Sequence, residues 1–259
     1  MPSLPTFPST EAPLGLIPLR IYGRTAEIRL CVSLLSSTNA TAVVLAGMGG
    51  SGKTTVALAV ARIAQMRRMR VWWIDCEYKP IPLAMLGIAK DLGASDSELI
   101  SAAQSDSETA DLAWRYLRAC ESRWLLIFDN ADDAANLHIN ERRVGSGAAW
   151  VRRAEAGYTL ITSRIMDTAI WGPQAQVMEL GAIALRDASR MLLALAPEAG
   201  DLHSAGMLAR KLACLPLALE LAATYLARPT SLHTKFDEYA SELSKKYCRA
   251  SRTTAPWTR

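Results

Sequence analysis

The sequence lacks any hydrophobic run long enough to cross a membrane and any cysteine pairs at metal-ligand spacing. A membrane-spanning helix needs about 18 consecutive apolar residues, and no stretch of the 259 residues approaches that length. The five cysteines are scattered and odd in number, which is typical of small buried side chains in a reducing compartment. The N-terminus has neither the charged start nor the apolar core of a signal peptide. We therefore expect a cytoplasmic protein with no membrane partner.

An excess of charge of one sign is also missing. The net charge is only +4 and the basic residues form no dense block, so nucleic acid is not indicated as a partner. Half of the residues are apolar and 21% are charged, as in a globular protein. The length suits one large domain or one domain with a smaller companion, and no internal repeat is visible.

What the sequence does contain is a phosphate-binding loop. Residues 47–55 (GMGGSGKTT) fit the pattern G-x-x-x-x-G-K-[ST]. The apolar run at 42–46 predicts a buried strand before the loop, and residues 56–64 predict a helix after it, which is the context that the motif requires. Glycines leave backbone N–H groups free to surround phosphate oxygens, and the helix N-terminus adds its positive dipole end. The glycines concerned are Gly47, Gly49, Gly50 and Gly52.

The side chains of this loop predict ATP or ADP with Mg²⁺ as cofactors. Lys53 would reach the β- and γ-phosphates, and the Thr54 hydroxyl would ligate Mg²⁺. Ser51 and Thr55 complete the predicted nucleotide-binding loop.

Alternating strand and helix patterns predict an α/β fold. We expect a P-loop NTPase with a mostly parallel five-stranded sheet sandwiched by helices, followed by a small all-helical lid domain. Further strands are expected at 71–75, 124–129, 158–162 and 176–180, and helices at 25–35 and 82–92, with a loop at 36–39. Two capping boxes are expected, Ser95 with Glu98 and Ser105 with Glu108.

From residue 185 the strand patterns stop and helical patterns cover 185–195, 201–213, 216–227 and 231–247. This change in composition predicts four segments: a disordered leader at 1–19, a P-loop nucleotide-binding domain at 20–181, a helical lid at 182–247 and a disordered tail at 248–259.

Asp129 is the second sign of a nucleotide site. It ends the buried strand at 124–129, so its carboxylate should lie at the carboxyl edge of the sheet and hold Mg²⁺ there. The next residue, often a water-activating acid in ATPases, is Asn130, which cannot accept a proton. Asp132 and Asp133 either substitute for that acid or only cap the following helix. Slow hydrolysis is the resulting hypothesis.

Arg164 and Pro216 are two further candidate residues. Arg164 follows the strand at 158–162, where a guanidinium either reaches a γ-phosphate or is an ordinary surface arginine. Pro216 stands where a proline suits the start of a helix.

Taken together, these motifs resemble the NB-ARC domain of the STAND class of P-loop signalling ATPases, in the family's order over residues 20–245. Tyr22-Gly23-Arg24 is similar to the segment that lines the family's adenine pocket. Residues 47–55 resemble its phosphate loop, 125–133 its Walker-B stretch and 160–164 its sensor strand. Residues 215–219 (LPLAL) resemble the G-L-P-L-A motif of its lid, with Cys214 in place of the usual glycine. The resemblance implies that Arg164 contacts the γ-phosphate and that Pro216 packs on adenine.

The resemblance also implies a function: an ATP/ADP-binding switch in signal transduction that acts through conformational change and oligomerisation, with protein partners or self-association in the ATP state. The implied catalytic set is Lys53, Asp129 and Arg164, in a weak ATPase (an NTP hydrolase). A P-loop small-molecule kinase and a nucleotide-binding scaffold without turnover remain alternatives. The family's winged-helix unit and sensor repeats have no counterpart before Arg259, so a fragment, a truncated product and a minimal module all stay open.

Overall fold

The structure, a computed structural model, describes residues 5–34, 42–78 and 80–253, and for 246–253 it describes the backbone only. The loop predicted at 36–39 and the outer ends of the predicted leader and tail lie outside the described residues. The chain divides into two compact units. The first comprises Met1–Leu19, Ala26–Gly49 and Lys53–Leu180, and the second comprises Arg20–Thr25, Gly50–Gly52 and Gly181–Arg259.

The first unit is built on a five-stranded sheet in which every pair of neighbouring strands is parallel. Its strands lie in the order β2-β3-β4-β1-β5. Their bounds are β1 Ala42–Ala46, β2 Arg70–Asp75, β3 Trp124–Asp129, β4 Gly157–Ser163 and β5 Ala175–Glu179. β1 and β3 are buried along their whole length, as expected for strands covered on both faces. The chain thus has the predicted P-loop NTPase fold.

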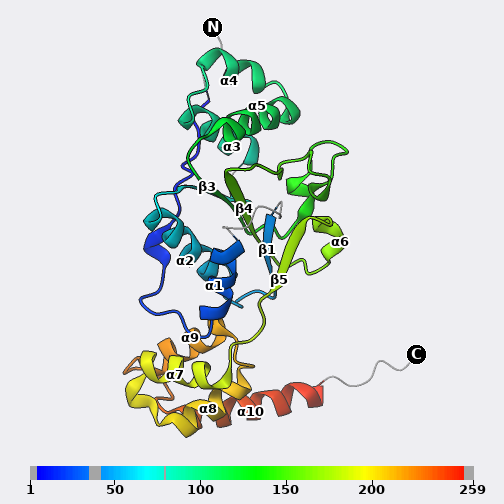
Figure 1. Cartoon of the computed structure of the whole chain (residues 1–259). Helices are drawn as coiled ribbons and strands as arrows, with labels where there is room; N and C mark the ends of the chain where they lie inside the picture. The colour runs from blue at the N-terminus through cyan, green and yellow to red at the C-terminus, as the bar shows by residue number, and fades with distance from the viewer. Residues whose placement is uncertain (1–4, 35–41, 79, 254–259) are drawn as a thin grey trace, which may run out of the picture. The chain divides into compact units, whose positions relative to one another are not determined.

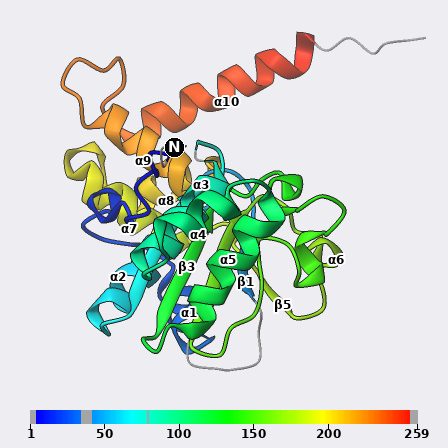
Figure 2. The ribbon, with the colours of Figure 1, turned by 90° about the horizontal axis from the view of Figure 1, so that it is seen from above.

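Helices cover both faces of this sheet (Figures 1 and 2). On one face α1 (Thr25–Leu34) and α2 (Lys53–Met66) pack over Val43 and Leu45. On the other face α3 (Ile81–Asp91), α4 (Asp96–Ala102) and α5 (Asp106–Ala119) pack over a tryptophan cluster, in which the rings of Trp114 and Trp124 meet edge to face at 5.9 Å. The shorter elements are α6 (Thr168–Trp171) and the 3₁₀ helices η1 (Leu14–Leu16), η2 (Ala134–Leu137) and η3 (Val144–Ser146).

The segment predicted to be a disordered leader differs from expectation, because its described part packs on the sheet edge and helices of the first unit. The Trp73 N–H on edge strand β2 donates to the Thr10 carbonyl at 2.7 Å. Phe7 lies against Gly87 of α3, and Leu14 and Ile17 pack on the α1/α2 side of the core. Prolines prevent a regular helix here, but an extended chain can still cover a sheet edge and bury its apolar side chains.

The second unit is helical and has its own core. Its helices are α7 (Leu185–Leu195), η4 (Pro197–Ala199), α8 (Leu202–Lys211), α9 (Pro216–Leu226) and α10 (Phe236–Thr253). Leu192, Leu208, Leu219 and Phe236 are fully buried together in it. Unlike the predicted division, this unit also includes Arg20–Thr25 and Gly50–Gly52.

The last helix differs from its predicted bounds of 231–247. It begins at Phe236, whose buried ring anchors the first turn, and continues to Thr253. Residues 248–253, predicted to belong to a disordered tail, are therefore helical, because neither proline nor glycine interrupts 236–253. No helix in the described part of the chain has both the length and the apolar character needed to span a bilayer.

Candidate nucleotide-binding site

The phosphate loop joins the carboxyl end of β1 to the start of α2. The Gly47 N–H donates to the Ser163 carbonyl at 3.1 Å, which ties the loop to β4. The Lys53 ammonium donates to the carbonyls of Gly47 and Met48 at 2.8 and 3.0 Å, so the lysine folds back along the loop. Burial lowers the pKa of Lys53, Asp132 and Asp129 oppose that shift, and Arg164 adds to it. Thr55 lies half-buried in the first turn of α2.

Asp129 meets the loop from the end of β3. Its Oδ1 accepts hydrogen bonds from the hydroxyls of Thr54 at 3.0 Å and Thr162 at 2.5 Å. The carboxylate is only 3% exposed, and burial raises its pKa while these two hydroxyls lower it. A hydroxyl and a buried carboxylate in contact are oxygen donors of the kind that Mg²⁺ prefers, so the residues fit that cation.

Asn130 and Asp75 form a second polar pair at this edge of the sheet. Asn130 adopts a left-handed backbone, with φ of 58°. Its N–H donates to the Thr162 hydroxyl at 3.0 Å, and its side-chain amide donates to Asp75 Oδ1 at 3.2 Å. Asp75 ends β2 directly beside Asp129 in the strand register. Asp75 is not among the predicted site residues, although it is the last residue of a strand, as Asp129 is.

The two other acidic residues of this segment have separate partners. Asp133 caps η2 by accepting from the Ala135 N–H at 2.9 Å. Asp132 pairs with Arg164 instead: its Oδ2 lies 2.7 Å from the arginine Nε. Of the two roles left open for these residues, capping applies to Asp133. Asp132 instead forms an ion pair with the Arg164 guanidinium.

Arg164 follows β4 and lies against the phosphate loop. A Cβ added at Gly49 would be 3.8 Å from the guanidinium carbon, an ordinary van der Waals contact. The Arg164 side chain is 68% exposed. The first unit therefore brings Lys53, Thr54, Asp129 and Arg164 to the same edge of the sheet.

The second unit contains the remaining predicted site residues. Arg24 is buried, and its Nη2 donates to the Ser51 carbonyl at 2.8 Å and also to the Gly181 carbonyl. The Leu217 N–H donates to the Gly50 carbonyl at 3.2 Å. Gly50 has φ of 79°, and a Cβ there would lie 2.8 Å from the Leu217 Cβ, so only glycine suits this position.

Pro216, Gly52 and Tyr22 complete this group. Pro216 is the first residue of α9, and its Cγ would lie 3.9 Å from a Cβ added at Gly52. Tyr22 is half-buried, with the Arg20 guanidinium 5.4 Å from its ring centroid. Gly23 next to it has φ of 63° and approaches Ile183 so closely that a Cβ would clash at 2.8 Å. Cys214, which stands where the resemblance expects a glycine, has φ of 51°, in the left-handed region.

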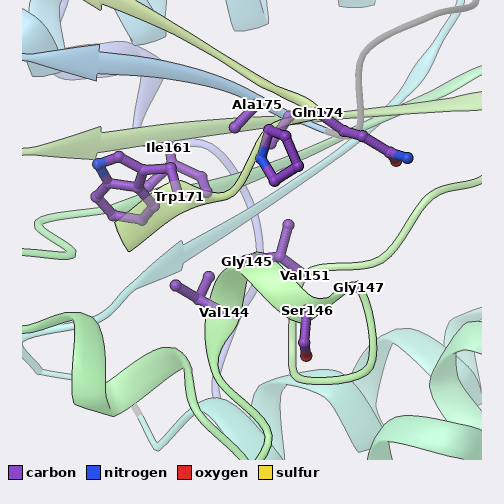
Figure 3. A pocket seen from close by; sticks show the side chains of 11 residues that line it. Val144, Gly145, Ser146, Gly147, Val151, Ile161, Trp171, Gln174 and Ala175 are labelled. Carbon is purple, nitrogen blue, oxygen red and sulfur yellow. The ribbon is translucent and has the colours of Figure 1, made fainter. Parts of the chain in front are cut away.

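A separate cavity of about 240 Å³ lies at the other end of the sheet. It opens near Ala42 and Ala175, the first residues of β1 and β5, whereas the phosphate loop follows the last residue of β1. Figure 3 shows Val144 and Val151 beneath the strands, with Ser146 and Gln174 directed away from the centre. The cavity therefore does not belong to the loop site.

Comparison with known proteins identifies a family for this chain. Residues 25–169, more than half of the chain, match the model of the NB-ARC domain family. No curated protein matches the chain.

Several solved structures share the fold. A Signal Transduction ATPase with Numerous Domains (STAND) with a tetratricopeptide repeat sensor, from Pyrococcus horikoshii, superposes with a TM-score of 0.59 at 14% identity, covering 92% of this chain and 34% of that one. The Drosophila ORC bound to DNA gives a TM-score of 0.61 at 14% identity, covering 98% and 73%. PCH-2 of C. elegans gives 0.54 at 10% identity, covering 91% and 73%. The chain thus spans about a third of the length of the STAND protein.

Proposed function

Because the chain belongs to the NB-ARC domain family, we propose that it is an ATP- and ADP-binding molecular switch that hydrolyses ATP slowly. The observation that carries the proposal is the hydrogen bond from the Thr54 hydroxyl to the Asp129 carboxylate. It joins the phosphate loop to the acid at the end of β3, the two groups that a Mg-nucleotide site requires.

The residues of the first unit have separate roles in this proposal. The loop amides and the Lys53 ammonium bind the β- and γ-phosphates, at the N-terminus of α2. Thr54 and Asp129 hold Mg²⁺, which neutralises phosphate charge when bound. Arg164 binds the γ-phosphate, so the loss of that group on hydrolysis removes a contact that ADP cannot replace.

The adenine side of the nucleotide is assigned by resemblance. Tyr22, Gly23 and Arg24 line the base, and Pro216 packs on it. The bond from Arg24 to the Ser51 carbonyl supports this assignment, because it connects that segment to the phosphate loop.

Hydrolysis is proposed to be slow because, among the described residues, each acid close to Asp129 already has a partner. Asp75 accepts a hydrogen bond from the Asn130 amide. Asn130 can orient a water molecule but cannot take its proton. Asp132 is engaged by Arg164, and Asp133 caps η2. Slow hydrolysis would then set how long the ATP-bound state lasts during signalling in the cytoplasm. In that state the protein would associate with itself or with a protein partner.

Phosphate release from ATP tests the proposal against its alternatives. Without any acceptor, the switch releases phosphate slowly, and Lys53→Ala abolishes that release. A P-loop small-molecule kinase would release little phosphate until an acceptor is added, and a scaffold would bind ATP without releasing any. Phosphate release that persists in Lys53→Ala would count against the loop as the site.

A further inference from the structure

We propose that Asp132 is a positioning residue that holds Arg164 in place for a γ-phosphate. The inference rests on the proposed function, since it concerns the residue that distinguishes ATP from ADP. The sequence predicts Asp132 only as a substitute base or a helix cap, and its pairing with Arg164 is visible only in the structure.

Asp132 contacts Arg164 through both of its carboxylate oxygens. Its Oδ1 accepts from the Arg164 backbone N–H at 2.7 Å, and its Oδ2 lies 2.7 Å from the side-chain Nε. One carboxylate therefore fixes both the backbone and the direction of the guanidinium. Because a guanidinium carries five N–H donors, the contact at Nε leaves the two Nη groups to bind a bidentate anion such as phosphate.

The ion pair with Asp132 leaves the Arg164 guanidinium close to the phosphate loop. A Cβ added at Gly49 would lie 3.8 Å from the guanidinium carbon and 3.9 Å from Nη2. Asp132 and Arg164 are also both among the charges that shift the pKa of Lys53. The charges of this pair thus act on the lysine that is expected to contact the same phosphate.

The segment that carries Asp132 is itself well anchored. The Ala131 N–H donates to the Thr162 carbonyl at 2.9 Å, and the Ser163 hydroxyl donates to the Ala131 carbonyl at 2.6 Å. Asp132 can therefore order the Arg164 side chain, which is 68% exposed even with this ion pair in place. Ordering an exposed side chain on binding costs affinity, so an arginine ordered in advance binds its anion more tightly.

The test measures the dissociation constants of Mg-ATP and Mg-ADP by calorimetry on the full chain. We expect Asp132→Ala to weaken ATP binding about two- to tenfold, the cost of ordering one side chain, and to leave ADP binding unchanged. Asp132→Asn, which keeps one acceptor, should lie between. Asp133→Ala is the matched control, because it removes a neighbouring carboxylate that does not contact Arg164.

The Arg164→Ala background separates the two proposals. If Arg164→Ala leaves the ATP-to-ADP affinity ratio unchanged, the sensor role fails and this inference fails with it. If Arg164→Ala lowers the ratio but Asp132→Ala does not, or if Asp132→Ala tightens ATP binding by removing repulsion, only the inference is overturned. A loss that is equal for ATP and ADP, or that persists in the Arg164→Ala background, also overturns it. Should Asp132→Ala fail to fold, the Asp132→Asn comparison decides.

Discussion

Asn130 is the residue on which the proposed slow hydrolysis depends. Its amide is bonded to Asp75, and its backbone N–H is bonded to the hydroxyl that also contacts Asp129. It is therefore held firmly beside the buried acid, but it lacks a group that can accept a proton. The sequence shows the missing base directly, whereas the contact with Asp75 depends on the register of β2 with β3 and requires the structure.

Replacing Asn130 with aspartate should accelerate ATP hydrolysis. The new carboxylate would lie next to Asp75, and two adjacent carboxylates raise the pKa of the pair. A base of this kind contributes up to about 10²–10⁴-fold, and we expect a gain of about tenfold in kcat that increases with pH as the pair deprotonates. Steady-state phosphate release checks this, with Asn130→Ala as the control. An unchanged rate with intact ATP binding would contradict the role given to Asn130.

At the scale of elements, two helix caps with the same sequence motif differ in their hydrogen bonds. Ser95 and Glu98 form a complete capping box, but Ser105 accepts from the Glu108 N–H without the return bond. Glu98 also accepts from Tyr116 of α5 at 2.8 Å. The two caps share one sequence motif, but only the first gains a further hydrogen bond from a distant residue, Tyr116. A local pattern therefore predicts the cap but not this bond.

Glu98→Gln should lower stability in a pH-dependent manner. Hydrogen bonds from the Ser95 backbone and hydroxyl and from Tyr116 lower the pKa of Glu98 to about 2. Because this folded pKa lies below the unfolded value, the carboxylate stabilises the fold above about pH 4 and loses that effect as pH falls toward 2. Denaturant unfolding at several pH values should show a stability difference between wild type and variant that is full above about pH 4 and shrinks as the pH falls toward 2. Glu108→Gln is the control, and an equal effect there would refute the argument.

The turn between α8 and α9 contains two consecutive non-glycine residues in the left-handed region, Ala213 with φ of 52° and Cys214 with φ of 51°. Side chains are strained in this conformation. Ala213→Gly should therefore stabilise the protein by about 0.5–1 kcal/mol. Ala103, also exposed and at a helix C-terminus but with φ of −67°, is the matched control, and Ala103→Gly should destabilise. Thermal unfolding distinguishes them, and a loss of stability in both would show that Ala213 is not strained.

At the scale of the whole molecule, the sheet, the phosphate loop and the place of Asp129 could be predicted from the apolar runs and the loop motif. Such features depend on local sequence and on the parallel α/β pattern. The pairing of Asp132 with Arg164, the packing of the leader and the cavity near Ala42 depend on contacts between distant segments, so no local pattern reports them. The roles assigned to the site residues remain predictions.

The leader should matter to the behaviour of the whole molecule in solution. Its Thr10 carbonyl covers the Trp73 N–H on edge strand β2, and an exposed edge invites pairing with other chains. Deleting residues 1–11 should therefore lower the melting temperature and increase light scattering on heating. Thr10→Ala keeps the backbone carbonyl and is the control. A deletion variant that melts and scatters like the wild type would show that the cover contributes nothing.

The most direct measurement of the central claim is a calorimetric titration of the full chain with Mg-ATP. We expect saturable binding at one site that Lys53→Ala removes or greatly weakens, while Lys235→Ala, which alters a lysine bonded to a carbonyl outside the loop, preserves it. Absence of binding to the folded wild type, or equal affinity in folded Lys53→Ala, would contradict the account.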